Sequence, residues 1–118
     1  MIQVKSPQDM KRLRRLALSA QGLLQKQPYG RGLAGVRQAI QHIGYVQIDT
    51  ISVVERAHHH VLYSRVPDFD VGMINQVLQK GDVFEYWAHA AAFLPMTDFR
   101  FSLPYKQAIK SGQTHWYR

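Results

Sequence analysis

The sequence predicts a mainly α-helical domain with a small antiparallel sheet, arranged as a winged helix-turn-helix. Several segments have apolar residues three or four positions apart, as amphipathic helices do. Three short segments alternate in polarity or are rich in aromatic residues, as strands are. After two helices, the order is strand, helix, helix, strand, turn, strand. The length of 118 residues and the hydrophobic content of 46% suffice for one domain with a modest core.

The first helix is expected to begin at Ser6, with Pro7 at the first helical position and Asp9 three residues after the serine. Gly22 is its expected end. One face of this helix carries an apolar stripe. The stripe consists of Met10, Leu13, Leu16, Ala17 and Ala20.

A loop over residues 26–32, marked by proline and glycine, leads to a second helix that closes at Gly44. In this helix an apolar residue is followed by others three, seven and ten positions later, which is the spacing of one helix face. These positions are Leu33, Val36, Ile40 and Ile43. A short strand over residues 45–49 is expected to follow.

The next helix is expected to open at the capping box Ser52-Val53-Val54-Glu55 and to run to about Ser64. Another helix, roughly 71–80, follows two aspartates and ends at Gly81. It takes the position of the recognition helix in a winged helix-turn-helix, yet it offers few side chains that read bases. Those it offers are Asn75, Gln76, Gln79 and Lys80.

Residues 83–87 are aromatic and strand-like, and residues 91–94 are expected to return as their hairpin partner, with a helix over 98–110. We therefore expect a single domain, 1–118, in three parts. These are basic N-terminal helices (1–44), a strand-helix-helix-hairpin unit (45–95), and a C-terminal helix with a tail (96–118). The tail carries two aromatic residues without terminal punctuation, which predicts the N-terminal fragment of a longer multi-domain protein.

Positive charge is concentrated in the N-terminal third. Residues 1–40 hold eight of the fifteen Lys and Arg but one acid, whereas residues 41–118 hold seven of each sign. This distribution is typical of a region that faces phosphate, although a solvated helix face gives the same pattern. For Arg56 and Arg65 the alternative is a surface ion pair with Glu55 or Asp68. The candidate phosphate contacts are Lys11, Arg12, Arg14, Arg15, Arg31, Arg37, Arg56 and Arg65.

Composition also disfavours several classes of protein. No apolar run reaches the length of a membrane span, and an anionic membrane surface would prefer a larger apolar face opposite the basic one. The chain has no cysteine, which excludes disulfides and thiolate zinc sites and fits the reducing cytoplasm. We therefore expect a cytoplasmic protein with no membrane partner.

The strand over 45–49 is the leading candidate for a catalytic element. Val46 and Ile48 alternate with Gln47 and Asp49, so the amide and the carboxylate are expected to project from one face, about 7 Å apart. A carboxylate placed this way can orient a water molecule or stabilise a developing positive charge. The alternative is that Asp49 caps the helix that follows.

The histidines are weaker candidates. His58, His59 and His60 occupy consecutive helical positions about 100° apart, so they cannot converge on one ion, and we expect no metal and no cofactor. His89 lies in the turn after Trp87 and is a possible secondary site residue. A hydrogen-bonded structural histidine in a hairpin is its alternative interpretation.

Several short segments, spread over nearly the whole chain, resemble one known family. They are Arg15-Leu16-Ala17-Leu18, Gln21-Gly22-Leu23, Gly44-Tyr45-Val46-Gln47-Ile48-Asp49-Thr50, Val54-Glu55-Arg56-Ala57-His58, Tyr63-Ser64-Arg65 and Phe84-Glu85-Tyr86-Trp87-Ala88-His89-Ala90, running to Leu94-Pro95. In this order and spacing they resemble the opening of the winged-helix alkylpurine DNA glycosylases of the YcaQ/AlkZ type, a bacterial family that unhooks interstrand crosslinks.

The resemblance implies tandem winged-helix domains and a C-terminal β-barrel clamped around double-stranded DNA that is alkylated or crosslinked. It also implies a Gln-x-Asp or Gln-x-Gln catalytic pair, which falls on Gln47 and Asp49; the Asp form matches the crosslink-unhooking branch. Asp49 would be general base and electrostatic stabiliser, and Gln47 would position water or the sugar. The chain is far shorter than the family's proteins, so it would lack their later domains. We expect a monomer, near the nucleoid of a bacterium.

Two other functions stay open from the sequence. A non-enzymatic winged-helix DNA-binding module would account for the charge distribution without any role for Asp49. An interaction domain would use the strands and the aromatic tail, with Trp116 and Tyr117, to dock a partner.

Overall fold

The computed structural model describes residues 3–48 and 55–113. It confirms a mainly α-helical class with a small antiparallel sheet, and the elements follow the predicted order. Within these residues, no helix is both long and apolar enough to cross a membrane. The elements are α1 (Pro7–Ala20), α2 (Gly32–Ile43), β1 (Val46–Gln47), α3 (Ala57–Tyr63), α4 (Gly72–Gln79), β2 (Val83–Trp87), β3 (Ala91–Pro95), the 3-10 helix η1 (Met96–Asp98) and α5 (Phe99–Lys110).

The three strands form one sheet in the order β1-β3-β2, and both pairings are antiparallel. β2 and β3 form the predicted hairpin. β1 contributes two residues, because Val46 pairs with Phe93 and Gln47 with Ala92. Neighbouring residues of a strand point to opposite faces, so Val46 enters the core while Gln47 is exposed. Tyr86, which pairs with Ala92, shares the face of Gln47.

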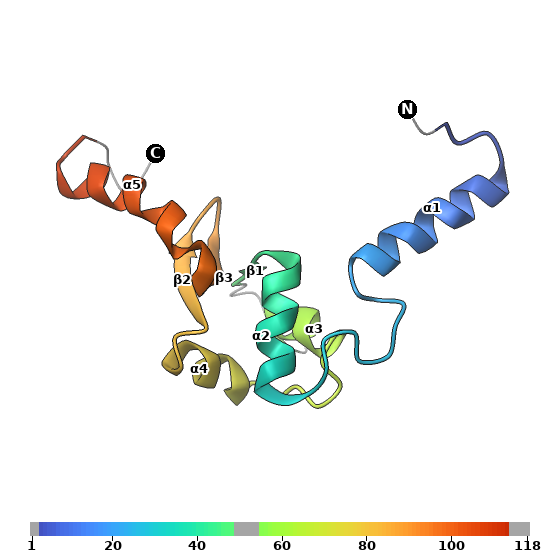
Figure 1. Ribbon diagram of the computed structural model, residues 1–118, viewed down its shortest axis with the longest axis horizontal. Coiled ribbons are helices and arrows are strands. Elements are labelled where there is room, and N and C mark those ends of the chain that lie inside the picture. Colours follow the sequence, from blue (N-terminus) through green and yellow to red (C-terminus); the bar gives the residue numbers. More distant parts are fainter. Residues whose placement is uncertain (1–2, 49–54, 114–118) are drawn as a thin grey trace.

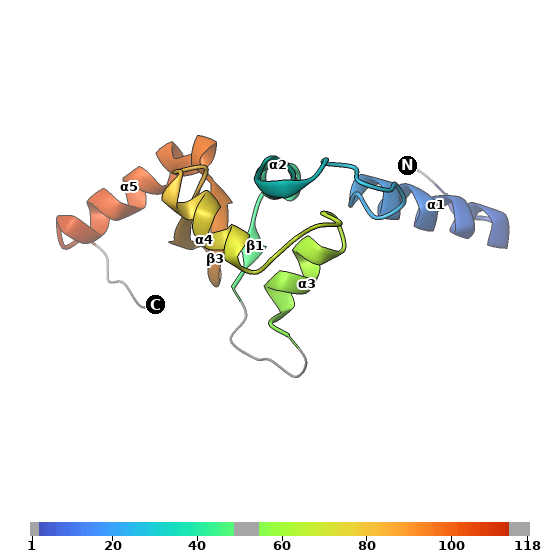
Figure 2. The same cartoon turned by 90° about the horizontal axis from the view of Figure 1, so that it is seen from below.

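The core forms where α2 packs against α4 and β3. Val36 and Ile40 of α2, Leu62 of α3 and Val77 of α4 are fully buried there. Figures 1 and 2 show α2, α3, α4 and the sheet gathered at the centre, with α1 and α5 extending in opposite directions. The radius of gyration is therefore 17.3 Å, whereas a compact domain of this length has about 13–14 Å.

Helix α1 begins as predicted, since the Ser6 hydroxyl accepts a hydrogen bond from the Asp9 amide at 3.1 Å. Its apolar stripe, however, packs against no other element, and α1 has no buried residue. Leu16 keeps 62% of its surface exposed. The reason is its direction, because α1 extends away from the core (Figure 1).

Two side chains attach the C-terminal end of α1 to the core. Nε2 of His42, on α2, lies 2.8 Å from the carbonyl oxygen of Ala20, and Nε of Arg65 donates to the carbonyl oxygen of Gln21 at 3.0 Å. Helix ends leave carbonyl groups without intrahelical partners, and cationic side chains are favourable there. Gly22 follows with φ of 70°, a conformation typical of glycine after a helix.

The expected start of α3 is wrong. The capping box predicted a helix from Ser52 onward, but residues 55 and 56 are not helical and α3 begins at Ala57. Glu55 instead accepts hydrogen bonds from the amide of Arg56 at 2.7 Å and from Nδ1 of His59 at 2.9 Å. It therefore stabilises the first turn of a later helix; Ser52 lies outside the described residues.

The contrast between the core and α1 gives a first prediction. Leu62→Ala should lower the free energy of unfolding by about 2–5 kcal/mol, because it opens a cavity beside α2 and α4. Leu16→Ala, the matched control on α1, should change it by less than about 0.5 kcal/mol. Urea unfolding followed by circular dichroism measures both. Equal losses would contradict the exposed position of α1.

Candidate active site and nucleic-acid interface

Gln47 is the part of the predicted catalytic pair that the structure describes. Its backbone is fixed by pairing with β3, and the next amide, of Ile48, donates to the carbonyl oxygen of Ala91 at 2.7 Å. The side chain is exposed and lines a hollow of about 420 Å³ together with Tyr45 and Arg65. Its amide can therefore donate to and accept from a bound molecule. Asp49 lies outside the described residues, so the pairing with Gln47 stays a prediction.

The structure gives Arg65 contacts with backbone carbonyls, and the expected phosphate contact stays a prediction. It is 9% exposed, and its guanidinium donates to Gln21 through Nε and to the carbonyl oxygen of Val61 through Nη1 at 2.9 Å. These carbonyls lie at the C-terminal ends of α1 and α3, where backbone acceptors lack partners. Arg65 therefore joins the two helices, and it brings its positive charge close to Gln47.

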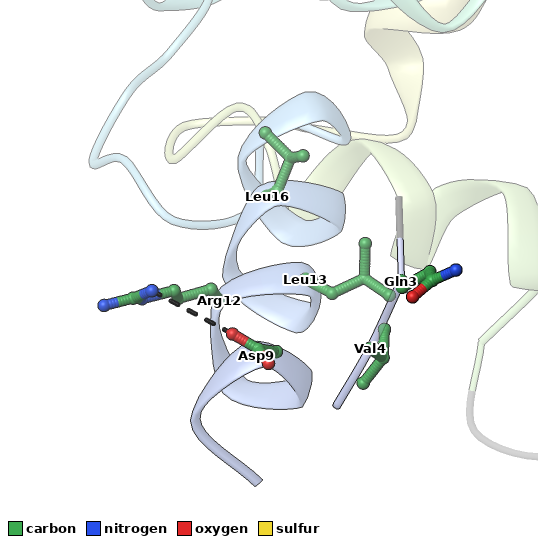
Figure 3. Close-up of a pocket in the computed structure, with 6 residues that line it drawn as sticks. All are labelled: Gln3, Val4, Asp9, Arg12, Leu13 and Leu16. Carbon is green, nitrogen blue, oxygen red and sulfur yellow. Dashed lines mark ion pairs between the residues drawn. The ribbon is translucent and has the colours of Figure 1, made fainter. Parts of the chain in front are cut away.

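The cations of α1 are all exposed and form a continuous surface. At 100° per residue, Lys11, Arg12, Arg14 and Arg15 occupy the side of the helix opposite the apolar stripe. Figure 3 shows Arg12 directed toward Asp9 on one side of α1, while Leu13 and Val4 lie on the other side. The Arg12–Asp9 distance is 4.0 Å and Arg12 is 83% exposed, so this ion pair leaves the guanidinium available.

Two further cations come from the region around α2. Arg37 is exposed on the helix itself. Arg31 precedes the helix, and its Nε lies 3.7 Å from a carboxylate oxygen of Asp68, whose other oxygen accepts from the amide of Gly32 at 2.9 Å. Arg31 therefore belongs to a helix N-terminal cap, although 63% of its side chain remains exposed to an anion.

A larger groove of about 570 Å³ lies between α3, α4 and the sheet. Arg56, exposed at the N-cap of α3, lines it. Other polar residues that line it include His59, Asn75 and Glu85. From the sequence, His59 is rejected as a metal ligand, Asn75 is a base-reading side chain of the helix 71–80, and Glu85 belongs to a family-like segment. Their proximity could not be predicted, because they come from elements distant in the sequence.

The three consecutive histidines differ in environment, although the rings of His58 and His59 are in contact, with 4.2 Å between their centroids. His58 is buried, with its ring 6.0 Å from that of Phe93; His59 contacts Glu55; and His60 is exposed. In the part of the chain that the structure describes, no three His, Asp or Glu side chains come together as metal ligands would.

His89 is exposed in the turn between β2 and β3. Its ring and that of Tyr45 form a T-shaped contact, with 5.3 Å between centroids and 90° between ring planes. Tyr45 immediately precedes β1, so this contact links the hairpin turn to the strand that carries Gln47. Its position is compatible with both interpretations given by the sequence.

Arg65 provides a second prediction. Arg65→Gln should lower the free energy of unfolding by about 1.5–3 kcal/mol, because buried carbonyls lose a charged donor. Arg37→Gln is the exposed control and should change stability by less than about 0.5 kcal/mol. Urea unfolding of both variants is the measurement. A stable Arg65→Gln protein that only binds DNA more weakly would instead support the phosphate contact.

Glu55 provides a third prediction. The hydrogen bond from the Arg56 amide, followed by that from His59, lowers the pKa of Glu55 below its usual 4.5. A lowered pKa in the folded state adds stability that is complete above the unfolded value and is lost as the pH falls through the folded one. The stability advantage of wild type over Glu55→Gln should therefore shrink as the pH falls from about 5.5 to about 3. Urea unfolding at several pH values measures this difference, and a constant difference would contradict the contact.

Comparison with known proteins identifies the family of this chain. Residues 40–118, more than half of the chain, match the sequence model of the family described as DNA glycosylase AlkZ-like. The matched range contains β1 with Gln47, the hairpin, the larger groove, and every lining residue of the smaller hollow except Gln21. No solved structure matches the chain. The match confirms the resemblance drawn from the sequence: this chain belongs to the AlkZ-like DNA glycosylase family.

Proposed function

We propose that this chain is the N-terminal part of a DNA repair enzyme that hydrolyses the N-glycosidic bond of N7-alkylated purines and unhooks interstrand crosslinks. The family match carries this proposal, because its range includes the sequence Gln47-Ile48-Asp49. The exposure of Gln47 in a hollow beside β1 supports it. We also propose that the protein acts as a monomer at the nucleoid, in the cytoplasm of a bacterium.

The chemistry of the substrate suits a site with one carboxylate. An N7-alkylated purine is already cationic, so the bond between C1′ and N9 can break with its electron pair moving to the base, without protonation of the leaving group. Asp49 would stabilise the oxocarbenium-like sugar and accept a proton from the water that attacks C1′. Gln47 would hold that water or the sugar through its amide.

The exposed cations would supply affinity for the duplex that does not depend on sequence. Six of them lie on or beside α1 and α2, and α1 extends far enough from the core to follow a duplex beyond the site (Figure 1). Contacts with phosphate release counterions, so binding should weaken steeply with salt. These cations are Lys11, Arg12, Arg14, Arg15, Arg31 and Arg37.

Further domains of the parent protein would complete the DNA channel. A catalytic pair needs its geometry held by surrounding groups, and the later domains implied by the resemblance would provide part of that support. We therefore expect low turnover by the 118-residue chain and full turnover by the parent protein.

Release of N7-methylguanine from alkylated DNA, measured by mass spectrometry for the chain and its parent, tests the proposal. Asp49→Asn should reduce the rate at least about a hundredfold, the range of a general base, while DNA affinity stays close to that of wild type. Gln47→Ala should also reduce the rate. Asp98→Asn and Gln38→Ala remove the same functional groups outside the site and should leave it unchanged.

Two results would contradict this assignment. Undiminished release by Asp49→Asn would exclude Asp49 as the general base. Salt-dependent DNA binding by the chain and its parent without any release would exclude the enzyme and favour the non-enzymatic DNA-binding module.

A further inference from the structure

The groove between α3, α4 and the sheet adjoins the strand that carries Gln47. Gln47 lines the hollow with Arg65, and the next residue, Ile48, lines this groove. Figure 2 shows α3 and α4 on the two sides of β1. By the strand register, Glu85 and Phe93 lie on the face of the sheet opposite Gln47. A nucleotide whose sugar lies beside Gln47 could therefore reach the groove only around the end of β1. The volume of about 570 Å³ lies within the roughly 300–1,000 Å³ of small-molecule sites.

Glu85 is the unexpected residue of this groove. It is an exposed carboxylate on β2, in a chain with a net charge of +7. Among the residues that the structure describes, none forms an ion pair with it. Lys106 lines the neighbouring hollow together with Glu85, but its ammonium lies over the ring of Phe99, 4.2 Å from the centroid. A carboxylate repels phosphate and attracts positive charge, so Glu85 is a residue of this groove that can recognise a cationic ligand.

The remaining residues of the groove suit a nucleotide. Phe93, which is buried in the core, forms part of the apolar floor of the groove. Asn75, exposed on α4, offers both a donor and an acceptor to the edge of a base. Arg56 lines the same groove and is exposed, so it can neutralise a phosphate.

We propose that this groove binds the N7-alkylated purine of a monoadduct, whose nucleotide is free to rotate out of the duplex, and that Glu85 recognises the positive charge of the base. The groove carries one fixed charge of each sign, Glu85 and Arg56. An N7-alkylated nucleotide carries the matching pair, a cationic base and an anionic phosphate. An undamaged purine has no positive charge, so Glu85 would favour the lesion over normal bases. This inference rests on the proposed function, because it assigns the base subsite of the same reaction; extrusion of the target base is common to enzymes that act on bases.

Two lesion analogues that are not hydrolysed can test whether the groove recognises the charge of the base or its shape. 2′-Fluoro-N7-methylguanine in a duplex is cationic and resists hydrolysis, whereas 7-methyl-7-deazaguanine has nearly the same shape and is neutral. Fluorescence anisotropy with the 118-residue chain should give tighter binding of the cationic duplex by about twofold to fivefold, the range of an exposed ion pair. Glu85→Gln should abolish this preference, while its affinity for the neutral duplex should rise no more than that of Asp82→Asn, since both changes remove one charge that repels phosphate. Asp82→Asn, a nearby carboxylate that does not line the groove, should keep the preference.

The results distinguish the two proposals. A preference that survives in Glu85→Gln, or a wild-type chain without one, overturns the role of Glu85 even when N7-methylguanine is released. Absent release by the chain and its parent, with the preference present in wild type and lost in Glu85→Gln, overturns the proposed function and leaves recognition by the groove standing. Unfolding curves of both variants establish that they are folded at the assay temperature.

Discussion

The burial of one face of α2 is the constraint on which the other elements depend. Val36 and Ile40 are fully buried against α4 and β3, and a sheet this small cannot form a core alone. Gly44 ends α2 with φ of 86° and directs the chain immediately into β1. Val46 is then the residue that enters the core, which leaves Gln47 facing outward. The exposure of Gln47 thus follows from how α2 packs and ends.

Helix ends determine how much positive charge remains for a ligand. Arg65 is committed to carbonyls at the ends of α1 and α3, and Asp68 binds both the first amide of α2 and the nearby Arg31. These polar contacts satisfy backbone groups that would otherwise lack partners. The cations of α1 do not satisfy backbone groups of other elements in this way, because α1 has no buried residue. A count of formal charges therefore overestimates the number of cations near the core that are available to a ligand. For α1, whose cations are all exposed, the count is close to the available number.

Local patterns could be predicted from the sequence, and long-range partners could not. The start of α1, the end of α2 and the hairpin depend on caps, glycines and alternation within a few residues, and all are as expected. The predicted start of α3 was wrong. Glu55 could lie inside the first turn of a helix that begins after Ser52, or just before a helix that begins later. Its hydrogen bond with His59 corresponds to the second position. The role of Arg65 depends on Gln21, 44 residues away. The exposure of Gln47 followed from alternation, whereas the groove of Glu85 needed three separate elements to be placed together.

The separation of α1 from the core has a consequence for how such a protein can diverge. Substitutions on α1 meet no packing partner, so the number and spacing of its charges can drift with little effect on folding. Its joint with the core is different, because a Cβ at Gly22 would overlap the hydroxyl of Tyr29. The charge carried by α1 and the stability of the core are therefore encoded in separate stretches of the chain, and selection can adjust one while leaving the other intact.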